Sequence, residues 1–288
     1  MYATQTEYYR ADSVDNAISL LTQHEDAKIL AGGHSLIPLM KLRLAAPAAL
    51  IDIGRIGSIK GVDQGDATIT IGALTTHAEI AASDAVKTNC PILAEAAGMV
   101  GDPAVRNRGT IGGNIAHSDP ASDLPAVLTA LNARLNITGP NGTRREPVSG
   151  FIEGLMQNNL EATEIMTSVE VPRKQPYQGM AYAKFEHPAS RYAVVGAAAM
   201  VTVTDGKCTA ASVAIGGVES KPTVGNSVQA SLIGSAPTDA VLDEAANSIL
   251  DDIGDDVLGD IFASAEYRKA MTVVYLRKAL VSAVERAG

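Results

Sequence analysis

Residues 30–36 have the sequence Leu30-Ala31-Gly32-Gly33-His34-Ser35-Leu36, in which a strand-like apolar run meets two glycines and then a serine that opens a helical pattern. Such a turn exposes backbone N–H groups to an anion, and glycine has no Cβ to keep a phosphate away from them. The Ser35 hydroxyl can cap the helix or bind a phosphate oxygen. The spacing matches neither the GxxxxGK[ST] phosphate loop nor the GxGxxG dinucleotide turn.

The segments on either side of this turn predict a small β-loop-α-β unit. Helical spacing follows the cap candidate Ser13, and strands are expected at 28–31 and 50–53 with a helix over 36–44 between them. A turn signal at 62–66 precedes the β-branched run 68–71, which predicts a hairpin. We therefore expect a second subdomain to begin near residue 57.

The remaining chain divides at a polar segment with two prolines, 172–176, where we place a domain boundary. Before it, a capping box at Thr76 and Glu79 and the proline at 91 each predict a helix start. Strands are expected at 134–138 and 165–171, separated by the turn 139–142, and a helix runs through 127–131. Beyond the boundary, strands at 179–185, 194–204 and 208–215, with Asp205-Gly206 as a hairpin turn, predict an antiparallel sheet. Helices are expected over 238–250 and 264–286.

Composition excludes several classes of function. The 288 residues correspond to about two domains. Lys and Arg number 23 against 32 Asp and Glu, a net charge of −9, so a nucleic-acid partner is not expected. The two cysteines, Cys90 and Cys208, are too far apart in sequence to suggest a zinc or iron–sulfur motif. The longest apolar stretch, 193–203, is too short to cross a bilayer, so we expect no transmembrane segment and a cytoplasmic protein.

A second glycine-rich segment strengthens the binding hypothesis. Residues 106–125 are dense in polar and turn-forming residues and contain Thr110-Ile111-Gly112-Gly113-Asn114. The segment ends at Asp123, near the start of an apolar helix pattern. Two glycine segments beside hydroxyl and amide groups suit a ligand with two phosphates.

The motifs at 31–36 and 110–125 together resemble the FAD-binding signatures of the medium subunits of molybdenum hydroxylases. The likeness is greatest to aerobic carbon monoxide dehydrogenases, extends more distantly to xanthine dehydrogenases, and covers essentially the whole chain. It implies an α+β protein with a two-subdomain FAD-binding fold of the vanillyl-alcohol-oxidase/p-cresol-methylhydroxylase type, at 1–57 and 58–175. A C-terminal domain, 176–288, adds a small antiparallel sheet and a helix bundle.

The resemblance also implies which residues hold FAD noncovalently. The diphosphate is expected between 31–36 on one side and 110–114 on the other. Asp123 is expected to bind sugar or ribityl hydroxyls, although a charge at a helix N-terminus explains it equally well. Met166 and Lys184 match flavin- or adenine-contacting positions, but a methionine in an apolar strand is usually core. Tyr192 resembles an aromatic residue that covers the isoalloxazine ring, and His34 could donate to a phosphate, line the flavin or fill the turn. The expected cofactor-binding residues are Ala31, Gly32, Gly33, His34, Ser35, Leu36, Thr110, Gly112, Gly113, Asn114, Asp123, Met166, Lys184 and Tyr192.

The function implied by the resemblance is electron transfer within a larger oxidoreductase. No catalytic dyad or cluster cysteines are evident in the chain, so a bound flavin would carry its redox chemistry. In the family, a large subunit with molybdopterin-bound molybdenum oxidises the substrate, and a small subunit passes electrons through [2Fe–2S] clusters to FAD. A dimer of such heterotrimers is expected. Three alternatives stay open: the medium subunit of an aldehyde or N-heterocycle dehydrogenase, a self-contained flavin reductase, and a flavin-free scaffold.

Overall fold

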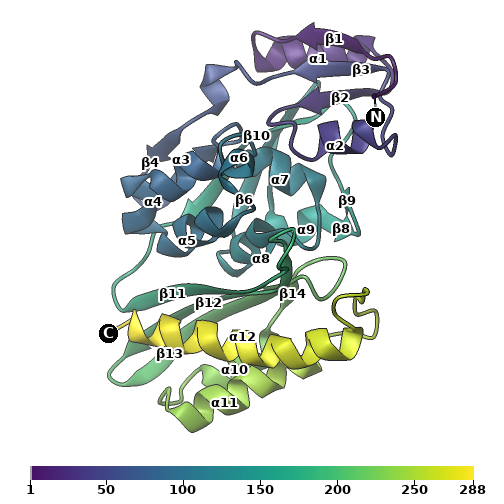
Figure 1. Ribbon diagram of the computed structural model, residues 1–288. Helices are drawn as coiled ribbons and strands as arrows, with labels where there is room; N and C mark the ends of the chain where they lie inside the picture. The colour runs from purple at the N-terminus through teal and green to yellow at the C-terminus, as the bar shows by residue number, and fades with distance from the viewer. Residues whose placement is uncertain (1) are drawn as a thin grey trace.

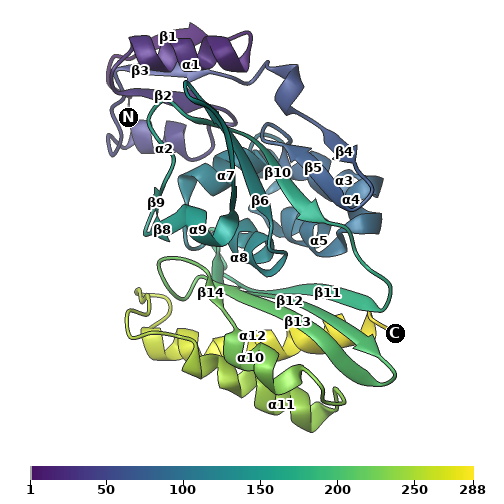
Figure 2. The same cartoon turned by 180° about the vertical axis from the view of Figure 1, so that it is seen from behind.

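Three main β-sheets follow one another along the chain in the computed structural model, which describes residues 2–288 (Figure 1). Helices pack between the second and third sheets and against the outer face of the third (Figures 1 and 2). This mixture of separate helical layers and sheets confirms the α+β class. No helix among the described residues is both long enough and apolar enough to cross a membrane.

The first sheet is three-stranded and parallel, as expected for strands joined through helices. Ser13 accepts the backbone N–H of Asn16 and caps the first helix, which confirms its predicted role. The second helix ends earlier than predicted because Arg43 adopts a left-handed backbone, φ +60°, just after it. The elements are β1 (Glu7–Arg10), α1 (Val14–Gln23), β2 (Ala27–Leu30), α2 (Leu36–Lys41) and β3 (Ala49–Asp52).

The second sheet is five-stranded and antiparallel, in the order β4-β5-β10-β6-β7. Its hairpin at 62–72 and the capping box of Thr76 and Glu79 are confirmed. The elements are η1 (Gly57–Ile59), β4 (Val62–Gln64), β5 (Thr68–Gly72), α3 (His77–Ala82), α4 (Asp84–Asn89), α5 (Pro91–Met99), α6 (Pro103–Arg106), α7 (Ile111–His117), α8 (Asp123–Ala130), β6 (Arg134–Gly139), β7 (Gly142–Pro147), α9 (Val148–Phe151), β8 (Ile152–Gly154), β9 (Gln157–Asn158) and β10 (Ile165–Pro172).

One strand of this sheet was not predicted. The turn at 139–142 joins β6 to β7, whereas the sequence placed it between β6 and β10. β7 is an edge strand whose sequence is polar and charged, so it lacks the apolar alternation that marks a half-buried strand. β10 instead pairs with β6 after a longer excursion through α9, β8 and β9.

The third sheet is four-stranded and antiparallel, with α10, α11 and α12 on one face and α5 and α8 on the other (Figures 1 and 2). Asp205 and Gly206, with φ of +51° and +73°, form the predicted hairpin turn. α12 approaches so closely that a Cβ on Gly179 would lie 1.8 Å from the Ala283 carbonyl oxygen. The elements are β11 (Gln178–Glu186), β12 (Ala193–Thr204), β13 (Lys207–Gly216), β14 (Thr223–Val224), α10 (Asn226–Leu232), α11 (Asp239–Ser248), η2 (Ile249–Asp251) and α12 (Ala265–Glu285).

The buried core links the second and third sheets. Apolar side chains of β5, β6 and β10 form one cluster with α5 and α8, and this cluster extends to Met180 and Tyr182 of β11. At the surface, Arg286 next to α12 donates to Glu95 of α5, at 2.9 Å, and to the Met180 carbonyl, at 2.8 Å. The shared core holds α5 and α8 between the two sheets, and Asp123 of α8 lines the cavity described next.

Candidate functional site

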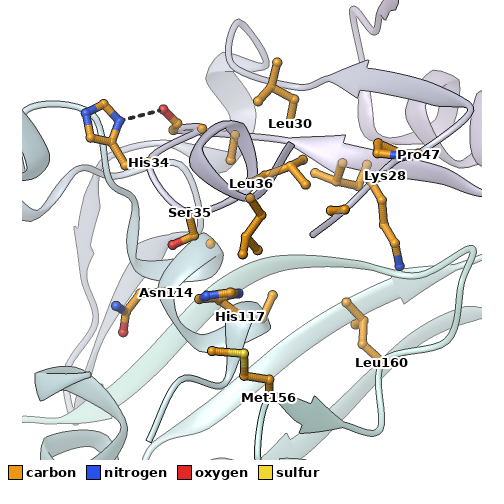
Figure 3. Close-up of a pocket in the computed structure, with 18 of the residues that line it drawn as sticks. Lys28, Leu30, His34, Ser35, Leu36, Pro47, Asn114, His117, Met156 and Leu160 are labelled. Carbon is orange, nitrogen blue, oxygen red and sulfur yellow. Dashed lines mark hydrogen bonds between the residues drawn. The ribbon is translucent and has the colours of Figure 1, made fainter. Parts of the chain in front are cut away.

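A cavity of about 1870 Å³ lies where the β2–α2 turn faces α7 and the loop before β12. Figure 3 shows Lys28, Pro47 and Leu160 toward one side of this cavity and His34, Ser35 and Asn114 toward the other. The lining continues to a second group of residues, which comprises His77, Val100, Gly101, Asp123 and Tyr192. Both groups and residues of the two glycine segments therefore line one cavity.

The first glycine segment lines the cavity and leaves several polar groups without a hydrogen-bond partner within residues 2–288. Among the described residues, no acceptor takes the backbone N–H groups of Gly33, His34 or Ser35. Ser35 stands at the N-cap position of α2, but its hydroxyl makes no capping hydrogen bond. The sequence allowed this hydroxyl to cap the helix or to bind a phosphate oxygen. The structure shows that it does not cap the helix.

Close packing explains the glycine at 32, and a local contact accounts for the ring of His34. A Cβ on Gly32 would lie 2.0 Å from the carbonyl oxygen of Arg108, because the second glycine segment crosses directly over the first. The His34 side chain is exposed, and its Nδ1 lies 3.2 Å from the Gly32 carbonyl oxygen (Figure 3). This contact is compatible with the turn-filling role of His34.

The glycine pair of the second segment lies at the start of a helix, α7, in a stretch whose sequence is dense in polar and turn-forming residues. Thr110 caps α7 by accepting the N–H of Gly113 at 3.2 Å, and the N–H groups of Ile111 and Gly112 donate to carbonyls at 73–75. The N–H groups of residues 111–114 are thus used within the protein. Gly112 is required by packing, since a Cβ there would lie 2.5 Å from the Ala73 Cβ. Gly113 is exposed, and a Cβ on it would lie 2.9 Å from the Thr110 Oγ1 that caps α7 and 3.9 Å from the Ala31 Cβ.

Asn114 contributes a buried polar atom that is not hydrogen-bonded. Its amide nitrogen donates to Ser122 Oγ at 3.2 Å. Its Oδ1 is buried and has no partner among the residues described. Since buried polar atoms are nearly always paired, an unpaired one in a cavity wall indicates a ligand or water at that point.

Two side chains of β11 donate hydrogen bonds to the carboxylate of Asp123. It is the first residue of α8 and lines the cavity, while Tyr182 donates to it at 2.7 Å and Lys184 at 2.9 Å. Burial raises the pKa of Asp123, and the Lys184 ammonium opposes this shift. This carboxylate therefore stands at a helix N-terminus and in the cavity wall at once. Lys184 itself does not line the cavity; its Nζ donates to the Met99 carbonyl and to Asp123.

Of the two remaining predicted residues, Met166 and Tyr192, only Tyr192 lines the cavity. Met166 lies in β10 within the buried core and does not line the cavity, as expected of a methionine in an apolar strand. Tyr192 lines the cavity and is 43% exposed, so it stands at the cavity's edge. Burial, together with the charges of Asp119 and Asp123, raises the pKa of Tyr192.

Most of the predicted residues therefore meet in one place. All of the expected cofactor-binding residues line the cavity except Gly112, Met166 and Lys184. Sequence reasoning missed Lys28, His77, Val100 and Leu160, which also line it. These four carry no local signal, because in the sequence they resemble ordinary strand, helix and loop residues.

Comparison with known proteins accounts for both the fold and the cavity. Residues 4–174 match the family model described as the FAD binding domain in molybdopterin dehydrogenase, and residues 180–283 match the CO dehydrogenase flavoprotein C-terminal domain. The chain belongs to the FAD-subunit family of molybdenum hydroxylases. This FAD subunit is 37% identical over 289 residues to the carbon monoxide dehydrogenase medium chain of Hydrogenophaga pseudoflava, covering 99% of each chain.

Two further comparisons extend this result. The FAD subunit is 36% identical to the 6-hydroxypseudooxynicotine dehydrogenase complex subunit alpha of Paenarthrobacter nicotinovorans, covering 98% of this chain and 95% of that one. Its structure matches that of the Hydrogenophaga pseudoflava carbon monoxide dehydrogenase which lacks the Mo-pyranopterin moiety of the molybdenum cofactor. The TM-score between the two structures is 0.96 at 37% sequence identity, and the match covers 100% of this chain and 100% of that chain.

The cavity of this FAD subunit suits its cofactor. Free N–H groups and a free hydroxyl at 33–35 offer donors for a diphosphate, and the unpaired Asn114 Oδ1 is a buried acceptor in the same wall. Among residues 2–288, no group of His, Cys, Asp or Glu side chains could hold a metal ion.

Proposed function

We propose that this chain is the FAD-carrying electron-transfer subunit of a heterotrimeric molybdenum hydroxylase of the carbon monoxide dehydrogenase type. It takes electrons from [2Fe–2S] clusters on a small subunit and passes them to an external acceptor. The substrate is oxidised on a large subunit that carries molybdenum–molybdopterin, and two heterotrimers associate. The observation that carries the proposal is the row of free donors at 33–35, which lines the same cavity as residues of α7.

Each part of the cavity has a role in this proposal. The N–H groups of Gly33, His34 and Ser35 hold the diphosphate, helped by the Ser35 and Thr110 hydroxyls. The apolar walls near Pro47 and Leu160 suit an adenine (Figure 3). When bound, FAD supplies the redox chemistry that the side chains lack.

Two residues lie where they can control the flavin end. Tyr192 at the cavity edge covers the flavin ring and excludes water from it. The Asp123 carboxylate, held in place by Lys184 and Tyr182, accepts hydrogen bonds from hydroxyl groups of the ribityl chain. In this arrangement Lys184 positions Asp123 and adds a buried positive charge near the site.

The second candidate is the medium subunit of an aldehyde or N-heterocycle dehydrogenase. It is favoured by the identity to the 6-hydroxypseudooxynicotine dehydrogenase subunit, 36%, which is nearly as high as the 37% to a carbon monoxide dehydrogenase chain. In both candidates this chain performs the same electron transfer. The choice between them lies in a large subunit with a different substrate pocket.

The test is native purification of the chain with its bound partners, followed by a visible spectrum, acid release of the pigment and subunit analysis. We expect FAD, iron–sulfur absorbance, and two further chains in equal amount. Turnover with carbon monoxide, with aldehydes and with N-heterocycles then distinguishes the two candidates. Flavin without partners, with NAD(P)H oxidation on a nucleotide sugar, would indicate a self-contained reductase. A colourless chain that takes up no added FAD would indicate a flavin-free scaffold.

A further inference from the structure

His77 is a buried polar residue in the cavity wall whose ring is not used by the protein. The residue is 2% exposed, and its Nδ1 is buried without a hydrogen-bond partner in residues 2–288. It lines the cavity together with Val100, Gly101 and Gly109. A buried nitrogen without a partner has lost its hydration and gained no hydrogen bond, which costs free energy. A histidine at this position therefore calls for an explanation, such as a ligand.

The backbone places this ring beside Gly109, close to where the two glycine segments cross. The N–H of His77 donates to the Gly109 carbonyl at 3.0 Å, and the Thr76 capping box fixes the start of α3. A Cβ on Gly109 would lie 2.9 Å from His77 Cδ2 and 3.0 Å from its Nε2, so the glycine leaves the space that the imidazole fills. The same Gly109 lies next to Gly32, where an added Cβ would be 3.0 Å from the Gly109 Cα.

The imidazole of His77 is neutral at physiological pH. Burial lowers the pKa of His77 to about 4, and the positive charge of Arg106 adds to this effect. Arg106 is not a partner for the ring, because its guanidinium donates to the carbonyls of Val100 and Gly101, both at 3.0 Å. A neutral imidazole offers one donor and one acceptor, which suits an uncharged polar group better than a phosphate.

His77 belongs to the same end of the cavity as Asp123. Lys184 joins the two regions, since its Nζ contacts Asp123 at 2.9 Å and the Met99 carbonyl at 3.1 Å, next to Val100. Lys28, Pro47 and Leu160 lie on the other side of the first glycine segment (Figure 3). A dinucleotide with its diphosphate at the glycine segments therefore directs one half toward His77 and the other toward Lys28.

We propose that His77 is a cofactor-contacting residue whose ring hydrogen-bonds an uncharged group of the flavin half of FAD. The proposal rests on FAD binding in this cavity. The flavin half carries such groups on the pyrimidine edge of its ring and on the ribityl chain. A contact to the ring alters the flavin's absorption spectrum, whereas a contact to the ribityl chain alters affinity alone.

The test uses the full chain, freed of flavin and titrated with FAD by fluorescence. His77→Leu removes both ring nitrogens, and His77→Asn keeps a polar group near the position of Nδ1. The matched control is Thr129→Val, because Thr129 Oγ1 is also buried without a partner among the described residues but does not line the cavity. The flavin-free stability of each variant is measured by thermal unfolding.

For His77→Leu we expect at least a tenfold rise in the Kd for FAD, with a flavin-free Tm that is unchanged or higher because an unpaired polar atom is removed. His77→Asn should recover part of the affinity, and Thr129→Val should bind FAD like the wild type. A wild-type Kd and spectrum for His77→Leu would overturn the proposal. A raised Kd accompanied by a lower flavin-free Tm, without recovery in His77→Asn, would also overturn it, because that pattern is structural. If the wild-type chain binds no FAD, the proposed function fails instead, and the two failures are distinguishable.

Discussion

The ammonium of Lys184 lies 2.9 Å from the carboxylate of Asp123, which precedes it by 61 residues, and both side chains are buried. This contact joins β11 of the third sheet to the first residue of α8, in the cavity wall. A buried ion pair contributes little net stability, but loss of one partner leaves an uncompensated charge. Lys184 therefore matters for the shape of the cavity although it does not line it.

Substitution Lys184→Met should lower the free energy of unfolding by about 3–5 kcal/mol, because the Asp123 carboxylate stays buried without its partner. The double variant Lys184→Met/Asp123→Asn should lose much less than the sum of the two single variants. Urea unfolding of all four chains provides this double-mutant cycle. Strict additivity would show that the two side chains are not coupled.

Ser35→Ala should weaken FAD binding without destabilising the flavin-free chain, because the Ser35 hydroxyl makes no cap to α2. Ser13→Ala is the matched control: Ser13 does cap α1, so its loss should cost about 1 kcal/mol of stability and leave the Kd for FAD unchanged. Chemical unfolding and FAD titration are run on both variants. Equal FAD affinity in Ser35→Ala and the wild type would remove Ser35 from the proposed diphosphate site.

Gly112→Ala should destabilise the flavin-free chain by about 1–3 kcal/mol, because its Cβ would meet the Ala73 side chain at 2.5 Å and push α7 away. Gly98→Ala in α5 is the comparison, since its Cβ would lie 3.8 Å from Ala81, an ordinary contact. That substitution should leave stability unchanged or raise it by up to about 1 kcal/mol. If Gly112→Ala instead loses FAD with full stability, Gly112 acts at the cofactor rather than in packing.

The stability of the flavin-free chain should fall as the pH drops from about 6.5 to about 4, partly because of His77. Burial lowers the pKa of His77 to about 4, so in this range the unfolded chain binds a proton that the folded chain does not. The loss should reach about 3 kcal/mol and stop below the folded-state pKa. Urea unfolding of the wild type and of His77→Leu across this range isolates the effect. Parallel pH profiles for the two chains would show that His77 is not buried as a neutral ring.

Local signals in the sequence determined most of the secondary structure. The Ser13 cap, the Thr76 capping box, the Asp205-Gly206 turn and the long C-terminal helix are each specified within a few residues, so they could be predicted. The glycine pairs also identified the two segments that form the middle of the cavity. β7 could not be predicted, because an edge strand of polar and charged residues has no apolar alternation.

Tertiary structure alone decided how the residues of the cavity are used. Gly112 and Gly113 have the same local sequence signal, yet packing buries the first against Ala73 and exposes the second. His77 enters the cavity wall because Gly109, 32 residues later, leaves room for its ring, and Asp123 is held by residues of a different sheet. Hydroxyl caps and turns depend on neighbours in the chain, whereas cavity walls and buried charges depend on segments that meet only after folding. The sequence by itself therefore determined the elements and the class of ligand, and the tertiary structure decided which side chains reach it.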